Sequence, residues 1–234
     1  MSRPLQRMFT EVPPRYDLIN TVVTWGLDRR WRRTAAEECL GNKPEKFLDL
    51  CCGTGDLALT VCHLGGGGVS VAGIDYSLPM LAIARAKSAS WNEGRHISFI
   101  HGDAGSLPFP DVSFDCVGIS FAFRNLTYKN PLAGQHLTEV RRVLAAGGRY
   151  VIVETSQPNS KLIRRIFHRY LRWFVRNVGF WLSGNKGAYS YLAESAAGFY
   201  TTEEVSAMLL WAGFREIRYR PFLFGAAGIH IAVK

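Results

Sequence analysis

Long apolar runs, paired cysteines and an acidic excess are all missing from this sequence. No segment approaches the run of about 18 apolar residues that a membrane-spanning helix requires. The opening segment, MSRPLQRMFTEVPPRYD, lacks the apolar core of a secretory signal peptide. Five cysteines without C-x-x-C spacing argue against a disulfide framework and against a zinc site. The cysteines are interpreted as buried free thiols of a reducing compartment: Cys39, Cys51, Cys52, Cys62 and Cys116.

The composition is that of an ordinary globular chain with one unusual number. The 234 residues suit a single α/β domain, and 47% of them are hydrophobic. Lysine and arginine number 28 against 19 aspartates and glutamates, so the formal net charge is +9. Such an excess suggests an anionic partner: a nucleic acid, an acidic membrane surface or an anionic ligand. Charge alone does not choose among them.

Strand and helix patterns alternate through the first two thirds of the chain. Short apolar runs predict strands, and segments rich in helix formers separate them, which indicates parallel β-α-β units. The predicted strands are 46–51, 69–75, 96–101, 114–121 and 149–154, and the predicted helices include 56–64 and 79–88. Asp28 is predicted to cap an N-terminal helix that ends at Gly41.

The alternation stops between residues 156 and 200 and then resumes. A helix over 202–212 precedes strands over 216–220 and 229–233, and the short connection between these strands predicts a hairpin. We therefore expect an α/β fold with a Rossmann-like sheet, mostly parallel with an antiparallel last strand, and helices on both faces. We expect one domain over 1–234, with an N-terminal helical lid over 1–42 and an insertion over 156–200.

A glycine turn between the first strand and its helix is the strongest local signal. Gly53 and Gly55 permit close approach of a ligand to the backbone, and Asp75 at the end of the next strand can accept hydrogen bonds from ribose hydroxyls. The turn formally matches the dinucleotide pattern G-x-G-x-x-G/A, which would suit an NAD-dependent oxidoreductase. S-adenosylmethionine is the alternative, because its methyltransferases carry an acidic residue before the turn, where Asp49 lies.

A third acidic position follows the third predicted strand. Asp103, next to Ala104, lies where a carboxylate can accept a hydrogen bond from an adenine amine. A purely structural turn with exposed carboxylates is the competing interpretation of these acidic residues.

Read together, five sequence blocks resemble class I S-adenosylmethionine-dependent methyltransferases. The blocks around Tyr16, Arg124 and Tyr191 are the more specific ones, and they narrow the resemblance to the ubiquinone/menaquinone biosynthesis C-methyltransferases. The blocks are 8–31, 49–58, 107–125, 142–156 and 189–195. The resemblance implies the class I methyltransferase fold and S-adenosylmethionine as cofactor, with S-adenosylhomocysteine as product and no metal.

The resemblance also assigns the cofactor contacts. Thr54 and the glycine turn are implied to bind the methionine part and Asp75 the ribose, and Tyr76 is a further expected cofactor-binding residue. Asp103 and Ala104 are implied to bind the adenine, with a further cofactor contact from Ser120 at the end of the fourth strand.

The family transfers a methyl group to a ring carbon of a polyprenylated quinol. The expected substrate is demethylmenaquinol in menaquinone biosynthesis, and the alternative is a methoxy-benzoquinol in ubiquinone biosynthesis. Arg124, Asn125 and Tyr16 are the expected catalytic residues. A guanidinium stays protonated at ordinary pH, so Arg124 is expected to stabilise a phenolate rather than to act as a base. A structural ion pair of Arg124 is the competing interpretation.

The insertion contains a basic amphipathic segment, Lys161–Asn177. Its aromatic and aliphatic residues recur at one helical face, and four arginines recur two positions later, near the opposite face. The two sets are Ile163, Phe167, Tyr170 and Phe174, and Arg165, Arg169, Arg172 and Arg176. Such a helix can lie on an anionic bilayer, although packing of its aromatics with solvated arginines would explain the pattern as well.

These observations give the expected setting of the protein. We expect a cytoplasmic protein, peripheral at the inner face of the cell membrane, with no nucleic-acid partner. An RNA methyltransferase would suit the +9 charge, but the sequence lacks an Asn-Pro-Pro-Tyr motif, and no cysteine follows a proline or threonine. Whether the protein acts as a homodimer or in a quinone-biosynthesis complex is left open.

Overall fold

A seven-stranded sheet forms the centre of the computed structural model, which describes residues 16–91 and 97–234. The strand order is β3-β2-β1-β4-β5-β7-β6. The strands are β1 (Lys46–Leu50), β2 (Ser70–Asp75), β3 (Ile97–His101), β4 (Phe114–Ser120), β5 (Leu144–Thr155), β6 (Arg215–Phe222) and β7 (Ala227–Val233). Strand β7 alone among them runs antiparallel to its neighbours β5 and β6, which confirms the predicted sheet and its closing hairpin.

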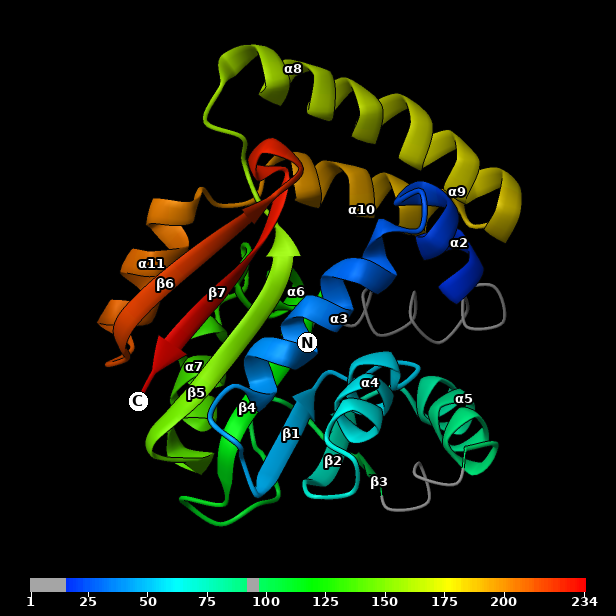
Figure 1. The fold of residues 1–234 in the computed structure, drawn as a ribbon. Coiled ribbons are helices and arrows are strands. Elements are labelled where there is room, and N and C mark those ends of the chain that lie inside the picture. Colours follow the sequence, from blue (N-terminus) through cyan, green and yellow to red (C-terminus); the bar gives the residue numbers. More distant parts are fainter. Residues whose placement is uncertain (1–15, 92–96) are drawn as a thin grey trace.

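Helices cover both faces of the sheet, as predicted (Figure 1). One face packs against α3 (Leu27–Leu40) and α4 (Asp56–Leu64), with Ala35, Leu57 and Val61 in a shared apolar cluster. The other face packs against α6 (Phe123–Thr127), α7 (Ala133–Val143) and α11 (Thr202–Trp211). Helix α5 (Leu78–Ala89) flanks β2 and β3. Both faces of the central strands are therefore buried, which explains their continuous apolar runs.

The N-terminal part of the described chain forms two helices, α2 (Tyr16–Val23) and α3. The prediction that Asp28 caps α3 is wrong, because Gly26 in the left-handed conformation (φ 74°) precedes the helix and Asp28 lies in its first turn. The predicted helix end at Gly41 is confirmed. Residues 1–15 of the expected lid lie outside the described residues.

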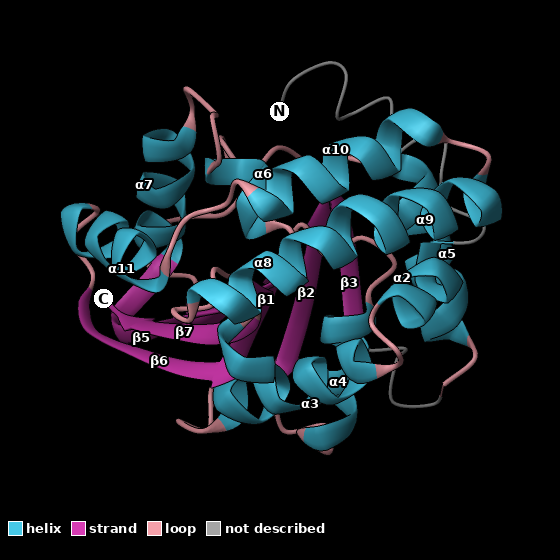
Figure 2. Ribbon diagram, turned by 90° about the horizontal axis from the view of Figure 1, so that it is seen from above, coloured by secondary structure: helices cyan, strands magenta, loops and turns pink. Residues whose placement is uncertain are grey.

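The insertion forms a helical layer over the carboxyl ends of the parallel strands (Figures 1 and 2). Its first helix runs through α8 (Lys161–Tyr170), one π-helical turn η3 (Leu171–Val175) and α9 (Arg176–Ser183). Helix α10 (Lys186–Ala197) lies beside it, and both pack against α2 through an apolar cluster that contains Ile19, Leu171 and Tyr189. Across the described ranges, none of the helices has the length and apolar character needed to cross a membrane.

The two faces of the α8–α9 helix differ as predicted. Phe167, Tyr170 and Phe174 pack against the apolar cluster, and the four arginines on the other side are exposed. The π-helical turn adds the fully buried Leu171 and Val175, which the sequence pattern did not predict. The turn η4 (Leu223–Gly225) between β6 and β7 faces the same layer.

Candidate functional site

The glycine turn lies between β1 and α4, where the backbone takes conformations that favour glycine. Gly53 has φ 54° and Gly55 has φ 80°. A Cβ atom on Gly55 would lie 3.0 Å from Ala84 and from the Phe99 ring, whereas a Cβ on Gly53 would meet no atom within 4 Å. Gly55 is thus required by packing, and Gly53 opens onto free space from which a ligand can approach the backbone.

Asp75 holds this turn in place from the end of β2. Its Oδ2 accepts a hydrogen bond of 2.8 Å from the Gly53 amide, and its Oδ1 accepts one of 2.8 Å from the Ser77 amide. Burial raises the pKa of Asp75, and these backbone hydrogen bonds oppose the rise. Tyr76 beside it is 42% exposed and leans on the His101 ring, with 5.7 Å between ring centroids. Both residues lie at the carboxyl end of β2, the end of a parallel strand at which ligands bind in open α/β sheets.

A cavity runs along the ends of β1, β2 and β4, and we call it the cofactor cavity. Every cofactor residue predicted from the sequence lines it except Gly55, which supports the turn from behind. The lining includes Asp49, Gly53, Thr54, Asp75, Tyr76, Asp103, Ala104 and Ser120.

Three polar atoms of this cavity are buried without a hydrogen-bond partner within the described part of the chain. They are Asp49 Oδ1, Ser120 Oγ and His136 Nε2. Buried polar atoms are rarely left unpaired in folded proteins, so their clustering around one cavity indicates a polar ligand. S-adenosylmethionine carries an ammonium group, two ribose hydroxyls and an adenine amine, and these donors suit such acceptors.

Asp49 is the most deeply buried carboxylate of the site, with 1% of its surface exposed. Its Oδ2 accepts a 2.9 Å hydrogen bond from the Ala58 amide in the first turn of α4, which ties the strand to the helix across the turn. Burial raises the pKa of Asp49 to about 8, and that hydrogen bond offsets part of the rise. A cationic ligand beside Asp49 would favour its ionised form.

A chain of charged side chains connects the N-terminal helices to the glycine turn. Asp17 accepts a 2.7 Å hydrogen bond from Thr54 Oγ1 and pairs with Lys87, whose Nζ also lies 2.6 Å from Asp56. Arg32 pairs with Asp56 at 3.0 Å. The sequence analysis missed this network. Only folding brings Asp17 to Thr54, which lies 37 residues along the chain.

Arg124 and Asn125, the catalytic candidates, begin helix α6 and face different surroundings. The Arg124 Nη1 donates to Glu154 Oε1 and to Thr155 Oγ1, each at 2.8 Å, and its backbone amide donates to Glu154 Oε2 at 3.0 Å. Both charged residues are 3% exposed, so this is a buried ion pair. Asn125 lines the cofactor cavity, and its Oδ1 accepts a 3.4 Å hydrogen bond from the Tyr191 hydroxyl.

Glu154 and Tyr191 were not singled out as site residues in the sequence analysis, although both fall in its family blocks. The side chain of Tyr16, the third catalytic candidate, lies outside the described residues.

A second cavity of about 450 Å³ lies between the N-terminal helices and the insertion, and we call it the apolar cavity. It shares Asn20, Arg32 and Phe121 with the cofactor cavity, so the two adjoin. Most of its lining is aliphatic or aromatic, including Val23, Trp31, Ile163, Phe167, Leu171 and Leu192. Asp28 and Arg124 are among its few charged residues. Its size falls within the range of small-molecule sites.

No group of three or more His, Cys, Asp or Glu residues suited to a metal ion occurs in residues 16–91 and 97–234.

The sequence matches a known family over almost its whole length. The profile of the ubiE/COQ5 methyltransferase family matches residues 2–234. A demethylmenaquinone methyltransferase of Thermus thermophilus is 42% identical over 224 residues, which cover 96% of this chain and 98% of that protein. One of Deinococcus radiodurans is 41% identical and covers 98% and 92%. A protein of Geobacter sulfurreducens named ubiquinone/menaquinone biosynthesis C-methyltransferase is 36% identical and covers 98% and 88%.

Solved structures share the fold at low sequence identity. The YcgJ protein of Bacillus subtilis has a TM-score of 0.62 at 17% identity and covers 88% of this chain and 98% of its own. An S-adenosylmethionine-dependent methyltransferase of Aquifex aeolicus has a TM-score of 0.57 at 18% identity and covers 81% of each chain. These likenesses confirm the fold class predicted from the sequence.

The raised pKa of Asp49 predicts how stability depends on pH. Between pH 4 and about 8 the folded chain keeps this carboxyl protonated while the unfolded chain ionises it, so the free energy of unfolding falls as pH rises. Each pH unit in that window removes at most about 1.4 kcal/mol. Asp49→Asn retains an acceptor for the Ala58 amide and removes this titration. We expect its urea denaturation midpoint to exceed that of wild type increasingly from pH 5 to pH 8.

The exposed carboxylate of Glu216, replaced by Gln, controls for the loss of one acidic group. Wild-type and Asp49→Asn stabilities that change in parallel with pH would show that Asp49 is ionised in the ligand-free protein.

Proposed function

Because the chain belongs to the ubiE/COQ5 methyltransferase family, we propose that it methylates a ring carbon of demethylmenaquinol to give menaquinol. S-adenosylmethionine is the cofactor of this family of methyltransferases, and the assignment disfavours the NAD-dependent and RNA-directed alternatives. The two most identical relatives described above are both named for demethylmenaquinone. The observation that supports this substrate best is an apolar cavity directly beside the cofactor cavity.

The apolar cavity suits a ring that carries a long prenyl chain. Its boundary with the cofactor cavity, at Asn20, Arg32 and Phe121, is where the proposed ring meets the methyl donor. From there the lining becomes aliphatic and aromatic towards α8, where Ile163 and Ile166 contact the proposed chain. Burial of such a chain is favourable by about 25 cal/mol per Å² of apolar surface.

The cofactor contributes a methyl group made electrophilic by the neighbouring sulfonium. The protein supplies position and proton transfer. Asp49, Ser120 and the Asp75-held glycine turn are the proposed contacts that orient the donor, and the wall of the apolar cavity keeps water from the reacting carbon.

We assign proton transfer to Asp28, a carboxylate that is 4% exposed and lines the apolar cavity next to the shared boundary. Its Oδ1 accepts a 2.9 Å hydrogen bond from Thr24 Oγ1, and its Oδ2 lies 3.1 Å from Arg32 Nη2. These contacts orient the carboxylate in a fixed position. Asp28 takes the proton of the ring hydroxyl as the ring carbon forms the new C–C bond and the bond from the methyl group to sulfur breaks. The ring C–H proton is then lost to solvent, and Asp28 returns its own proton to the ring oxygen. One proton is released overall.

Arg124 also lines the apolar cavity, and we propose that it orients the ring oxygen far from Asp28. Its ion pair with Glu154 fixes the guanidinium and offsets its charge, so the phenolate meets a weaker positive field than an unpaired arginine would supply. Asn125, the next residue of α6, lines the cofactor cavity, and we propose that it contacts the ring where the two cavities meet. Tyr16 stays a candidate from the N-terminal lid.

The substrate is tested with the purified protein, a labelled methyl donor and chemically reduced quinones. We expect methyl transfer to demethylmenaquinol, and transfer to the methoxy-benzoquinol at least tenfold slower. The Phe121 ring at the boundary and the neighbouring Trp31 ring of the apolar cavity offer a large aromatic surface, which suits a two-ring quinol better. Liquid chromatography with mass detection of the products measures both rates. Oxidised demethylmenaquinone is the control, since its electron-poor ring should accept no methyl group. Preferred methylation of the benzoquinol would contradict the menaquinone assignment.

Asp28→Asn tests the proposed proton acceptor. The amide still accepts from Thr24 but cannot take a proton, so turnover should fall about 10²–10⁴-fold while affinity for S-adenosylhomocysteine stays unchanged. Turnover is followed as labelled quinol, and affinity by calorimetry.

A second quinol distinguishes proton transfer from a structural role of Asp28. A quinol with an electron-withdrawing ring substituent gives up its proton more readily, so the difference in turnover between wild type and Asp28→Asn should be smaller with it. An equal difference for both quinols, or near-normal turnover of the variant, would remove Asp28 from proton transfer.

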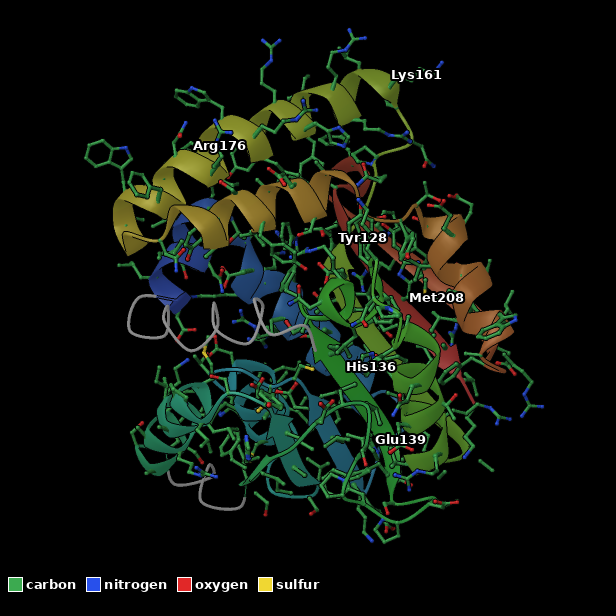
Figure 3. All side chains as sticks on the ribbon, turned by 180° about the vertical axis from the view of Figure 1, so that it is seen from behind. Tyr128, His136, Glu139, Lys161, Arg176 and Met208 are labelled. Carbon is green, nitrogen blue, oxygen red and sulfur yellow. The ribbon has the colours of Figure 1, made fainter. Side chains whose placement is uncertain are left out.

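We also propose that the exposed face of the α8–α9 helix binds an anionic membrane surface. This face carries arginines with large apolar side chains between them, and positions 161–181 contain no acidic residue. Leu162, Ile166, Trp173 and Trp181 are 65%, 61%, 70% and 83% exposed. Figure 3 shows the helix between its labelled residues Lys161 and Arg176, with side chains that extend away from the rest of the protein. Basic residues attract anionic headgroups, and exposed tryptophans suit the interface below them.

The membrane proposal is tested by reversing charge on this face. The triple variant Arg165→Glu, Arg169→Glu, Arg172→Glu lowers the net charge from +9 to +3. Each basic residue near an anionic surface contributes about 1 kcal/mol, so binding to phosphatidylglycerol vesicles should fall at least about 100-fold. Vesicle co-sedimentation measures the loss.

A matched variant reverses three exposed basic residues of the opposite sheet edge, Lys43, Lys46 and Arg215, with the same change of net charge. It should bind vesicles almost as wild type does. Equal losses in the two variants would indicate a general charge effect, and no vesicle binding by wild type would overturn the proposal.

A further inference from the structure

His136 is a buried histidine of α7 whose role is not explained by the chemistry above. It is 2% exposed, and its Nδ1 lies 3.0 Å from the carbonyl oxygen of Leu126. That oxygen can only accept, so Nδ1 carries the proton and Nε2 is left with a lone pair. Burial lowers the pKa of His136, which keeps the ring neutral near pH 7. Nε2 is therefore a buried acceptor with no partner among the described residues.

The acceptor side of this ring faces the loop that follows β3. A Cβ atom on Gly105 would lie 3.6 Å from His136 Cδ2, the ring carbon bonded to Nε2. Asp103 lies in the same loop, with its Oδ1 accepting a 2.8 Å hydrogen bond from the Gly105 amide. Both His136 and Asp103 line the cofactor cavity. A carboxylate and a neutral imidazole thus present two acceptors to one region of this cavity.

Helix α7 holds that loop firmly, so the two acceptors have a defined spacing. Gln135 donates to the Gly105 carbonyl at 2.7 Å, and Glu139 accepts from the Leu107 amide at 2.7 Å. Arg142 donates to the Leu107 and Phe109 carbonyls at 3.0 and 2.7 Å. His136 and Glu139 lie one helical turn apart on α7 (Figure 3). Such anchoring is typical of a preorganised binding site, in which the binding groups do not have to rearrange when the ligand arrives.

We propose that His136 Nε2 and the Asp103 carboxylate each accept one hydrogen of the exocyclic amine of adenine, so that His136 is a specificity-determining residue for the cofactor. The inference rests on the placement of adenine at Asp103 and Ala104. An amine with two hydrogens satisfies both acceptors at once. A purine with an oxo group at the same position offers an oxygen to two acceptors, and it leaves both without a partner. The histidine therefore excludes oxo-purine analogues of the cofactor.

His136→Asn is the sharpest variant, because an asparagine amide can replace Nδ1 as donor to Leu126 while it lacks the Nε2 acceptor. We expect it to weaken S-adenosylhomocysteine binding about three- to tenfold, the range of one neutral hydrogen bond. His136→Gln, whose longer amide can place an oxygen near Nε2, should recover most of the affinity. Calorimetry gives the affinities, and a thermal melt of the ligand-free variants checks that they fold.

An analogue separates recognition of the amine from a packing role. N6-methyl-S-adenosylhomocysteine keeps one amine hydrogen, so it should bind wild type at least tenfold more weakly than the parent compound. In His136→Asn that penalty should shrink to threefold or less, because the acceptor is gone and the shorter side chain leaves room for the methyl group. An equal penalty in both proteins would overturn the proposal, and so would unchanged S-adenosylhomocysteine affinity in His136→Asn.

Asp103→Asn distinguishes failure of this inference from failure of the adenine placement. Weaker binding in Asp103→Asn without any effect of His136→Asn would retain the adenine site and remove His136 from it. If neither variant changed the affinity, adenine would not bind at Asp103, and both the adenine placement and the role of His136 would be overturned.

Discussion

Burial of the Asp49 carboxylate is the constraint on which the site depends. The side chain joins the end of β1 to the first turn of α4, so the glycine turn between them cannot be formed without enclosing it. Its second oxygen has no partner in the described chain, and burial, with a smaller contribution from the nearby Asp75 and Asp56 carboxylates, raises its pKa to about 8. A cationic ligand removes this disadvantage, since an opposite charge favours the ionised form. If the proposed cofactor binds here, the turn would be more favourable with it than without it, and stability would be coupled to cofactor binding through Asp49.

A second buried charged group, the ion pair of Arg124 and Glu154, lies beside the apolar cavity. The Arg124–Glu154 pair joins α6 to the end of β5, and it lies between the fourth-strand end of the cofactor cavity and the apolar cavity. A buried ion pair contributes little net stability compared with an apolar pair of the same volume, but removing one partner leaves a buried charge. Its value here is positional, because four hydrogen bonds to Glu154 fix both side chains. The ion pair is the structural interpretation of Arg124 that the sequence left open, and it is compatible with the proposed contact to the substrate.

Much of the fold was predictable because it follows from local patterns. The sequence placed the end of β2 at Asp75 and the bounds of the helix over 56–64 to within one residue. Apolar runs and glycine turns mark such boundaries directly. The grouping of Asp49, Asp75 and Asp103 at one cavity was also predictable, because parallel strands end at a common edge. The start of α3 was not, because Asp28 resembles a cap in sequence while Gly26 serves as one in the structure.

Long-range pairings were beyond the sequence for a physical reason. The Asp17–Thr54 hydrogen bond depends on how α2 packs over the turn, and His136 has no motif spacing that would separate it from a surface histidine. Its significance comes from a missing partner, which only coordinates reveal. Likewise, helical periodicity predicted the inward aromatics and outward arginines of α8. It gave no indication of the buried Leu171 and Val175, which lie in a π-helical turn where the ordinary helical spacing is interrupted.

Helix α8 connects the charge of the protein to its chemistry. Ile163 and Phe167 line the apolar cavity from one side of this helix, while Arg165 and Arg169 face outward from the other. Ile166 belongs to both surfaces, since it lines the cavity and is also 61% exposed. A membrane bound by the arginines would lie against the mouth of the cavity, so a prenyl chain could pass from lipid to protein without crossing water. On the membrane proposal, much of the +9 charge would serve contact with an anionic bilayer rather than with a nucleic acid.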